Sequence, residues 1–109
     1  MDILTRMEET LLLAVWKLQD DAYGLAIRRH VSGLFDRTFS VGAIYMPLER
    51  LTKKGLLKTW ESDPTDKRGG RRKKFYKLTG EGVSALNQVR SFQEKAWAGL
   101  PTVLQFNPG

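Results

Sequence analysis

Six of the eight positions from Lys67 to Lys74 carry basic side chains, and the other two are Gly69 and Gly70. Such cations bind phosphate groups, and adjacent glycines let a chain turn tightly and approach an anion closely. The longer segment 53–77 holds ten basic and three acidic side chains, a net charge of +7, whereas the rest of the chain holds eight basic and nine acidic ones, a net −1. Two interpretations are open: a solvated loop, or contact with a polyanion such as nucleic acid.

Residues for covalent or metal chemistry are scarce. The chain has no cysteine, which excludes disulfides, thiolate zinc sites, iron–sulfur clusters and thiol catalysis. The single histidine, His30, lies beside two arginines with no recognisable nucleophile or orienting acid, and the acidic residues form no paired motif. We therefore expect no enzymatic activity, no metal and no cofactor.

Composition indicates a folded domain. Of 109 residues, 41% are hydrophobic and 28% are charged, which is the balance of a globular chain. The sequence contains no apolar run of about 18 residues that could span a membrane. Its first residues lack a basic stretch followed by an apolar one, so we expect no signal peptide and a cytoplasmic location.

Apolar periodicity predicts three consecutive helices. The first runs from Thr5 to Leu18, and Thr5 with Glu8 three residues later is the pattern of a capping box. The second runs from Tyr23 or Gly24 to Leu34. The third begins at Ser40, a good N-cap, and runs to Lys54, where Gly55 should end it; Pro47 leaves the geometry of its middle open.

Two strands and a fourth helix follow. Residues 56–62 and 72–78 are expected to form a hairpin, with turn residues between them, and Thr79 should cap a helix that Pro101 ends. Because a lone hairpin is marginally stable, Trp60, Phe75 and Tyr76 should pack partly against the helices. Three helices, a hairpin with a basic tip and a further helix predict a mainly α fold, a winged helix-turn-helix with an appended C-terminal helix.

This fold suggests which side chains would contact DNA. The third helix would enter the major groove and the hairpin would be the wing. The candidates lie in the first turns of that helix, at its far end and on the wing: Ser40, Val41, Gly42, Ala43, Tyr45, Arg50, Lys53, Lys67, Arg68, Arg71, Arg72 and Lys73. Two of them have alternative roles, because Ser40 could serve only as a cap and Tyr45 could pack in the core.

Several sequence blocks together resemble the PadR family of bacterial repressors. They are Tyr23-Gly24-Leu25-Ala26-Ile27, Ser40-Val41-Gly42-Ala43-Ile44-Tyr45, the stretch from Leu48 to Leu57, and the wing from Gly69 to Thr79 followed by Gly82. The resemblance covers roughly residues 5–98 and implies a homodimeric winged-helix transcription factor, often released from DNA by a small aromatic or drug-like effector. The chain is similar to the short branch, which has one C-terminal dimerisation helix. It departs from many relatives in placing Met46 between Tyr45 and Pro47.

The resemblance favours a role for the last helix in dimerisation. Candidate residues for a dimer interface or an effector pocket are Trp16, Val83, Leu86, Val89, Gln93 and Trp97. The two tryptophans have two possible roles: plain core and dimer packing, or the lining of a pocket between subunits. We expect residues 1–79 to form the DNA-binding domain, 80–100 the dimerisation helix and 101–109 a flexible tail.

The function predicted from the sequence is a homodimeric regulator, a repressor by resemblance, that binds a double-stranded DNA operator. One alternative is a winged-helix module for protein–protein contact without an operator, against which the charge of the wing argues. Another is an RNA-binding module. Such modules read single strands with exposed aromatic residues, whereas the aromatic residues of this chain are expected in the core.

Overall fold

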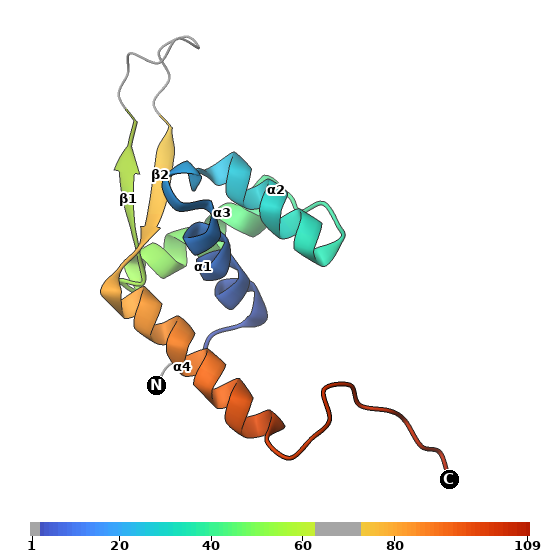
Figure 1. Cartoon of the computed structure of the whole chain (residues 1–109). Coiled ribbons are helices and arrows are strands. Elements are labelled where there is room, and N and C mark those ends of the chain that lie inside the picture. The colour runs from blue at the N-terminus through green and yellow to red at the C-terminus, as the bar shows by residue number, and fades with distance from the viewer. Residues whose placement is uncertain (1–2, 63–72) are drawn as a thin grey trace.

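The computed structural model describes residues 3–62 and 73–109. Within them the chain forms α1 (Arg6–Leu18), a 3-10 turn (Gln19–Asp21), α2 (Gly24–Phe35), α3 (Val41–Lys53), β1 (Leu57–Glu61), β2 (Lys74–Leu78) and α4 (Gly80–Trp97). The first three helices gather beside the hairpin, and α4 leads away from its base (Figure 1). This is the expected fold: four helices and a two-stranded antiparallel hairpin in winged helix-turn-helix order.

The core lies where the three helices meet the inner face of the hairpin. Its buried side chains come from the first three helices, both strands and Ala22 before α2: Leu11, Leu12, Ala14, Val15, Ala22, Ile27, Val31, Ile44, Leu48, Leu51, Leu57, Tyr76 and Leu78. These positions recur at three- and four-residue intervals in the helices and at alternate positions in β2, as amphipathic elements require. The core therefore fixes how α3 and the hairpin lie relative to each other.

The hairpin is braced by the segment that precedes α2. Its two strands pair antiparallel, with Leu57 opposite Leu78 and Trp60 opposite Phe75. On the other edge of β2, the Tyr76 N–H donates to the Ala22 carbonyl at 2.8 Å, and Tyr23 forms an isolated bridge with Phe75. Because an isolated hairpin is marginal in water, this third segment and the burial of Tyr76 account for its stability.

The helix ends confirm the predicted caps. Thr5 and Glu8 form the reciprocal capping box, Ser40 caps α3 and Thr79 caps α4. Gly55 follows α3 with a φ of 80°, in the left-handed region that glycine adopts without strain. Two other residues adopt positive φ without being glycine, Gln19 at 52° and Asp36 at 53°.

Pro47 does not interrupt α3. The helix runs unbroken from Val41 to Lys53, and Pro47 is buried on its inner face. A proline this far into a helix removes one main-chain hydrogen bond, and here the ring contributes to the core instead. The recognition helix of the fold is therefore continuous across the position that the sequence left open.

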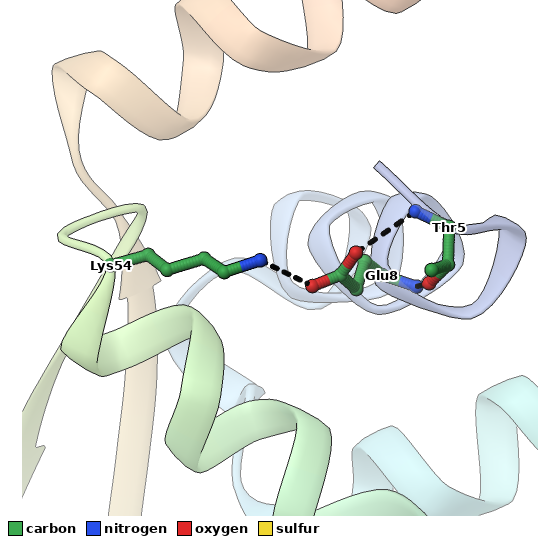
Figure 2. A network of polar contacts seen from close by, with 3 residues as sticks. All are labelled: Thr5, Glu8 and Lys54. Carbon is green, nitrogen blue, oxygen red and sulfur yellow. Dashed lines mark hydrogen bonds and ion pairs between the residues drawn. The ribbon is translucent and has the colours of Figure 1, made fainter. Parts of the chain in front are cut away.

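A polar network joins the start of α1 to the end of α3 (Figure 2). One carboxylate oxygen of Glu8 accepts the Thr5 N–H at 2.9 Å, and the other accepts from the Lys54 ammonium at 3.0 Å. The Glu8 side chain is only 7% exposed. One buried acid thus caps α1 and binds Lys54, the residue that caps the C-terminal end of α3.

The start of α4 is tied to the chain that follows α3. The Thr79 hydroxyl donates to the Gly55 carbonyl at 2.6 Å, and the Thr79 N–H donates to the Leu56 carbonyl at 3.1 Å. Gly82 lies so close to the Leu56 carbonyl and to Leu78 that a Cβ there would overlap both. The first turn of α4 therefore has a fixed position, whereas its later turns have no buried residue.

Of the aromatic residues expected to pack against the helices, Tyr76 is fully buried, and the three tryptophans lie partly exposed at the surface. Tyr76 is 1% exposed, but Trp16 is 54%, Trp60 44% and Trp97 49% exposed. Trp60 stacks on Phe75 at 4.3 Å between ring centroids, and it lines a small pocket together with Val15 and Trp16 of α1.

Residues 101–109 form neither helix nor strand. No helix in the described part of the chain is long and apolar enough to cross a membrane.

Candidate nucleic-acid interface

The first turn of α3 presents small side chains to solvent. The Ser40 hydroxyl accepts the Ala43 N–H at 3.2 Å, so this serine does cap the helix. Val41, Gly42 and Ala43 are all exposed. Small residues at the start of a recognition helix allow close approach to base edges, and the methyl groups of valine and alanine can contact those of thymine.

Tyr45, for which DNA contact and core packing were both considered, is partly buried and partly open to solvent. The residue is half-buried, and its hydroxyl end lies directly against the Cα of Gly24 at the start of α2. Any side chain at position 24 would overlap the ring. The pairing therefore sets how closely α3 approaches α2, which explains why a glycine stands at the start of α2.

Met46 is a residue of this surface that the sequence reasoning missed. It is 64% exposed, an unusual environment for a large apolar side chain, and it lies on the solvent side of α3 with Gly42, Arg50 and Lys53. Positions 42, 46, 50 and 53 follow helical spacing, so the periodicity of the exposed residues was the available signal. The face offers one apolar side chain between small residues at one end and two cations at the other.

A salt bridge joins α3 to the hairpin beside this face. The Lys74 ammonium lies 3.1 Å from a carboxylate oxygen of Glu49. The hydrogen bond to Glu49, together with the charge of the nearby Tyr76 hydroxyl, raises the pKa of Lys74, although burial opposes the shift. Lys74 therefore links the wing to α3 through an ion pair at the surface.

The rest of the basic run is only partly described. Lys73 is half-buried, with its ammonium 4.5 Å above the centre of the Tyr23 ring, and its N–H donates to the Ser62 hydroxyl at 2.8 Å. This contact orients Lys73 at the point where the hairpin leaves the helices. The other wing candidates, Lys67, Arg68, Arg71 and Arg72, lie outside the described residues.

Two arginines that were not among the candidates lie near the start of α3, Arg28 within α2 and Arg37 in the turn that follows it. Arg28 and Arg37 both contact Phe39, the residue just before the α3 cap. The sequence signal was present but weak, because basic residues on a helix or in a turn are usually only solvated. Their positions beside the start of α3 become evident once the fold is known.

The candidates for dimerisation surround a groove between α1 and α4. Its volume is about 740 Å³, and its walls include Leu13, Trp16, Val83, Leu86, Gln93 and Trp97. A hydrogen bond of 3.3 Å from Gln93 to Glu9 crosses it. The structure brings the two distant tryptophans to one surface. Of the candidates, Val89 alone does not line the groove.

The described residues contain no group of three or more potential metal ligands. His30 is half-buried, and its Nε2 atom has no hydrogen-bond partner among the described residues. Tyr76 has a similarly unpaired buried hydroxyl, and burial is the main reason that its pKa is raised. Neither group stands beside a set of residues that could act as nucleophile, base and orienting acid.

Comparison with known proteins gives a consistent result. The profile of the transcriptional regulator PadR-like family matches residues 11–88. No curated protein sequence matches. RosR of H. salinarum is 26% identical with a TM-score of 0.71, and the alignment covers 90% of this chain and 81% of RosR. A PadR family regulator from Clostridium difficile R20291 is 30% identical with a TM-score of 0.58, over 82% of this chain and 93% of the other. A PadR-like transcription factor from Bacteroides fragilis is 25% identical with a TM-score of 0.67, over 83% and 82%.

Proposed function

The chain belongs to the PadR-like family of DNA-binding transcriptional regulators, and from that premise we propose that it acts as a homodimeric repressor bound to a duplex operator. The observation that carries the proposal is the solvent face of α3. This face presents small residues in the first turn, then the exposed Met46, and then the cations Arg50 and Lys53. A recognition helix needs groups in this order to contact base edges and phosphates. Membership of a regulator family also argues against an enzyme.

The residues of this face would have separate roles. Val41, Ala43 and Met46 would contact base edges and thymine methyl groups, whereas Arg50 and Lys53 would contact phosphates and set the register. The Tyr45 hydroxyl would approach a phosphate only at its exposed edge, since the ring packs on Gly24. The basic residues from Lys67 to Lys73 would contact the DNA backbone from the wing.

We assign dimerisation to α4 and the groove beside it. Half-buried Val83, Leu86 and Val89, together with Trp97, give α4 an apolar surface that a monomer would leave in water. A two-fold dimer would bind a pseudo-palindromic site, with half-sites about 10 base pairs apart or a multiple of that spacing. Residues 1–79 would then bind DNA and 80–100 would join the subunits.

The groove between α1 and α4 is also the place we propose for an effector. Trp16 and Trp97 on its walls would bind a flat aromatic or cationic compound by stacking and by cation–π contact. Such a ligand would relieve repression only if it bound the DNA-free dimer more tightly. Linkage then requires that operator and ligand lower each other's affinity by the same factor.

The test begins with selection of bound sequences from a library of genomic DNA fragments by the purified chain. Binding to the selected duplex is then compared with single-stranded DNA and RNA over a range of salt concentrations. Lys53→Ala should lower the slope of log affinity against log salt by about one unit per subunit, because one phosphate contact is lost. Lys95→Ala, which removes the same charge near the far end of α4, should not. Equal binding to all three nucleic acids, or no selected sequence, would contradict the proposal.

A further inference from the structure

The main chain of Phe39 is held on both sides by α2. The Arg28 Nε–H donates to the Phe39 carbonyl at 2.7 Å, and the Phe39 N–H donates to the Ser32 hydroxyl at 3.4 Å. Phe39 immediately precedes Ser40, whose hydroxyl caps α3. The two side chains from α2 therefore fix the point from which the recognition helix starts.

The Phe39 side chain organises the rest of this turn. Its ring meets the Phe35 ring edge to face, with 5.4 Å between centroids. The Arg37 guanidinium lies 4.8 Å from the centre of the Phe39 ring. A cation stacked on an aromatic ring has fewer conformations to lose on binding an anion than a freely solvated arginine. Arg37 is exposed.

Neither arginine is neutralised by the part of the chain that the structure describes. Arg28 uses only its Nε–H in the bond to Phe39, so both terminal nitrogens of its guanidinium keep their donors. Arg37 forms no ion pair within these residues, and neither does Asp36, the one acid in the turn. Two oriented cations thus stand beside the first turn of α3 with donors to spare.

We propose that Arg28 and Arg37 bind a backbone phosphate of the duplex beside the bases that α3 reads. The inference rests on the proposed DNA binding and adds a second phosphate contact, separate from the wing. Guanidinium groups suit the task because they present paired N–H donors to phosphate oxygens. Because Arg28 also donates a hydrogen bond to Phe39, it would fix the start of the recognition helix relative to that phosphate.

Arg29 provides a matched control. It neighbours Arg28 on α2, carries the same charge, is exposed, and forms neither a hydrogen bond nor a cation–π contact with Phe39 among the described residues. The experiment measures affinity for the selected operator between 50 and 200 mM salt for the wild type, Arg28→Gln, Arg37→Gln and Arg29→Gln. Arg28→Lys is added because it keeps the charge, and thermal unfolding is followed for each variant to separate folding from binding.

Loss of one phosphate contact lowers the salt slope by about 0.9 per subunit. Raising the salt concentration fourfold lowers the affinity of every variant. For Arg28→Gln and Arg37→Gln we expect this fall to be smaller than the fall for the wild type by a factor of about 3.5 per subunit. Arg29→Gln should keep the wild-type slope, and Arg28→Lys should restore most of it. A purely structural role for Arg28 would change the unfolding temperature and leave the slope unchanged.

Two outcomes would overturn the inference. Slopes of Arg28→Gln and Arg37→Gln equal to the wild-type slope would remove the turn from the interface. An equal fall for Arg29→Gln would show that only total charge matters. Failure of the wild type itself to bind duplex DNA in a salt-dependent way would instead reject the proposed function, so the two failures can be told apart.

Discussion

The ammonium of Lys54 lies 3.0 Å from a carboxylate oxygen of Glu8, and this pair links the last turn of the recognition helix to the first turn of α1. The two partners differ in environment, since the lysine side chain is 44% exposed and the glutamate only 7%. Breaking the pair from the lysine side leaves a buried carboxylate that still accepts the Thr5 N–H. Breaking it from the glutamate side leaves a lysine that water can solvate.

The Glu8 carboxylate should make stability depend on pH in the acid range. Burial raises its pKa, but the Thr5 N–H and the Lys54 ammonium outweigh burial, so the pKa falls below its ordinary value of 4.5. A depressed folded-state pKa stabilises the protein above the unfolded value, and this stabilisation is lost as the pH falls through the folded value. Glu8→Gln keeps an amide acceptor for the cap and should cost roughly 1 kcal/mol at pH 7.

Urea unfolding at several pH values between 7 and 3 checks this prediction. The difference between wild type and Glu8→Gln should shrink as the pH falls below about 4.5. Glu94→Gln is the control, because Glu94 pairs with Arg90 on an exposed surface and should contribute little at any pH. A difference between wild type and Glu8→Gln that stays constant over the range would show that the charge of Glu8 is irrelevant.

Gln19 should be replaceable by glycine with a gain in stability. Its φ of 52° and ψ of −123° belong to a region that only glycine adopts without strain. Gln19→Gly also removes the hydrogen bond to the Trp16 carbonyl, which is exposed and contributes little. We expect a net gain of about 0.5–1 kcal/mol and a rise of several degrees in the unfolding temperature. Asp20→Gly, one residue later at a helical position, should instead destabilise the chain.

The contact between Gly24 and Tyr45 predicts strong coupling between the two positions. In Gly24→Ala the new methyl group overlaps the tyrosine ring, so α2 and α3 must separate or the ring must leave. We expect a loss of about 1–3 kcal/mol in the wild-type background. In the Tyr45→Ala background the same change should cost much less, because the overlap is gone. Additive losses in this double-mutant cycle would contradict the packing role.

Trp97 and Phe92 provide a test of the dimer surface. Both are exposed aromatic residues on α4, at 49% and 62%, but only Trp97 lines the groove with Trp16. Trp97→Ala should weaken dimerisation by at least tenfold, since buried aromatic anchors dominate such interfaces. Phe92→Ala should have a smaller effect. Sedimentation over micromolar concentrations measures both, and a monomeric wild type would reject the dimer.

The effector proposal is tested by tryptophan fluorescence. Planar cationic dyes should quench the wild type more than Trp97→Ala, and added operator should weaken dye binding. The same dyes should lower operator affinity by the same factor. If no dye quenches Trp97 at sub-millimolar concentration, or if quenching ignores the operator, the tryptophans of the groove serve only in packing.

Local signals in the sequence were sufficient to predict the helices and their N-terminal caps, although α4 ends at Trp97 and does not continue to Pro101 as expected. Thr5, Ser40 and Thr79 act on residues three positions away, and Gly55 acts on its own backbone, so these signals can be recognised without knowledge of distant contacts. The order of elements then leaves few arrangements, which is why the winged helix-turn-helix could be predicted. The exposed candidates on α3 follow directly from that arrangement.

Features that depend on distant partners could not be predicted in the same way. The bridge from Tyr23 to Phe75 joins segments that no short-range pattern relates. The contacts of Arg28 and Arg37 with Phe39 require the angle between α2 and α3. The sequence left two roles open for Trp16 and Trp97, and only the packing of α4 beside α1 shows that both side chains line one groove.

The attachment of α4 to the chain that follows the recognition helix means that a change in the direction of α4 moves the recognition helix. The first turn of α4 is bound through Thr79 to the chain just after α3, whereas the following turns contact the core only through the half-buried Val83 and Leu86. Eighteen residues at 1.5 Å each make an arm of about 27 Å. In the proposed dimer, a tilt of about 10° where two such helices meet would displace the attached recognition helix by about 5 Å, more than the rise of one base pair. A small compound bound near the crossing point would thus change the spacing of the two recognition helices, so that they no longer match successive major grooves, without contacting either helix.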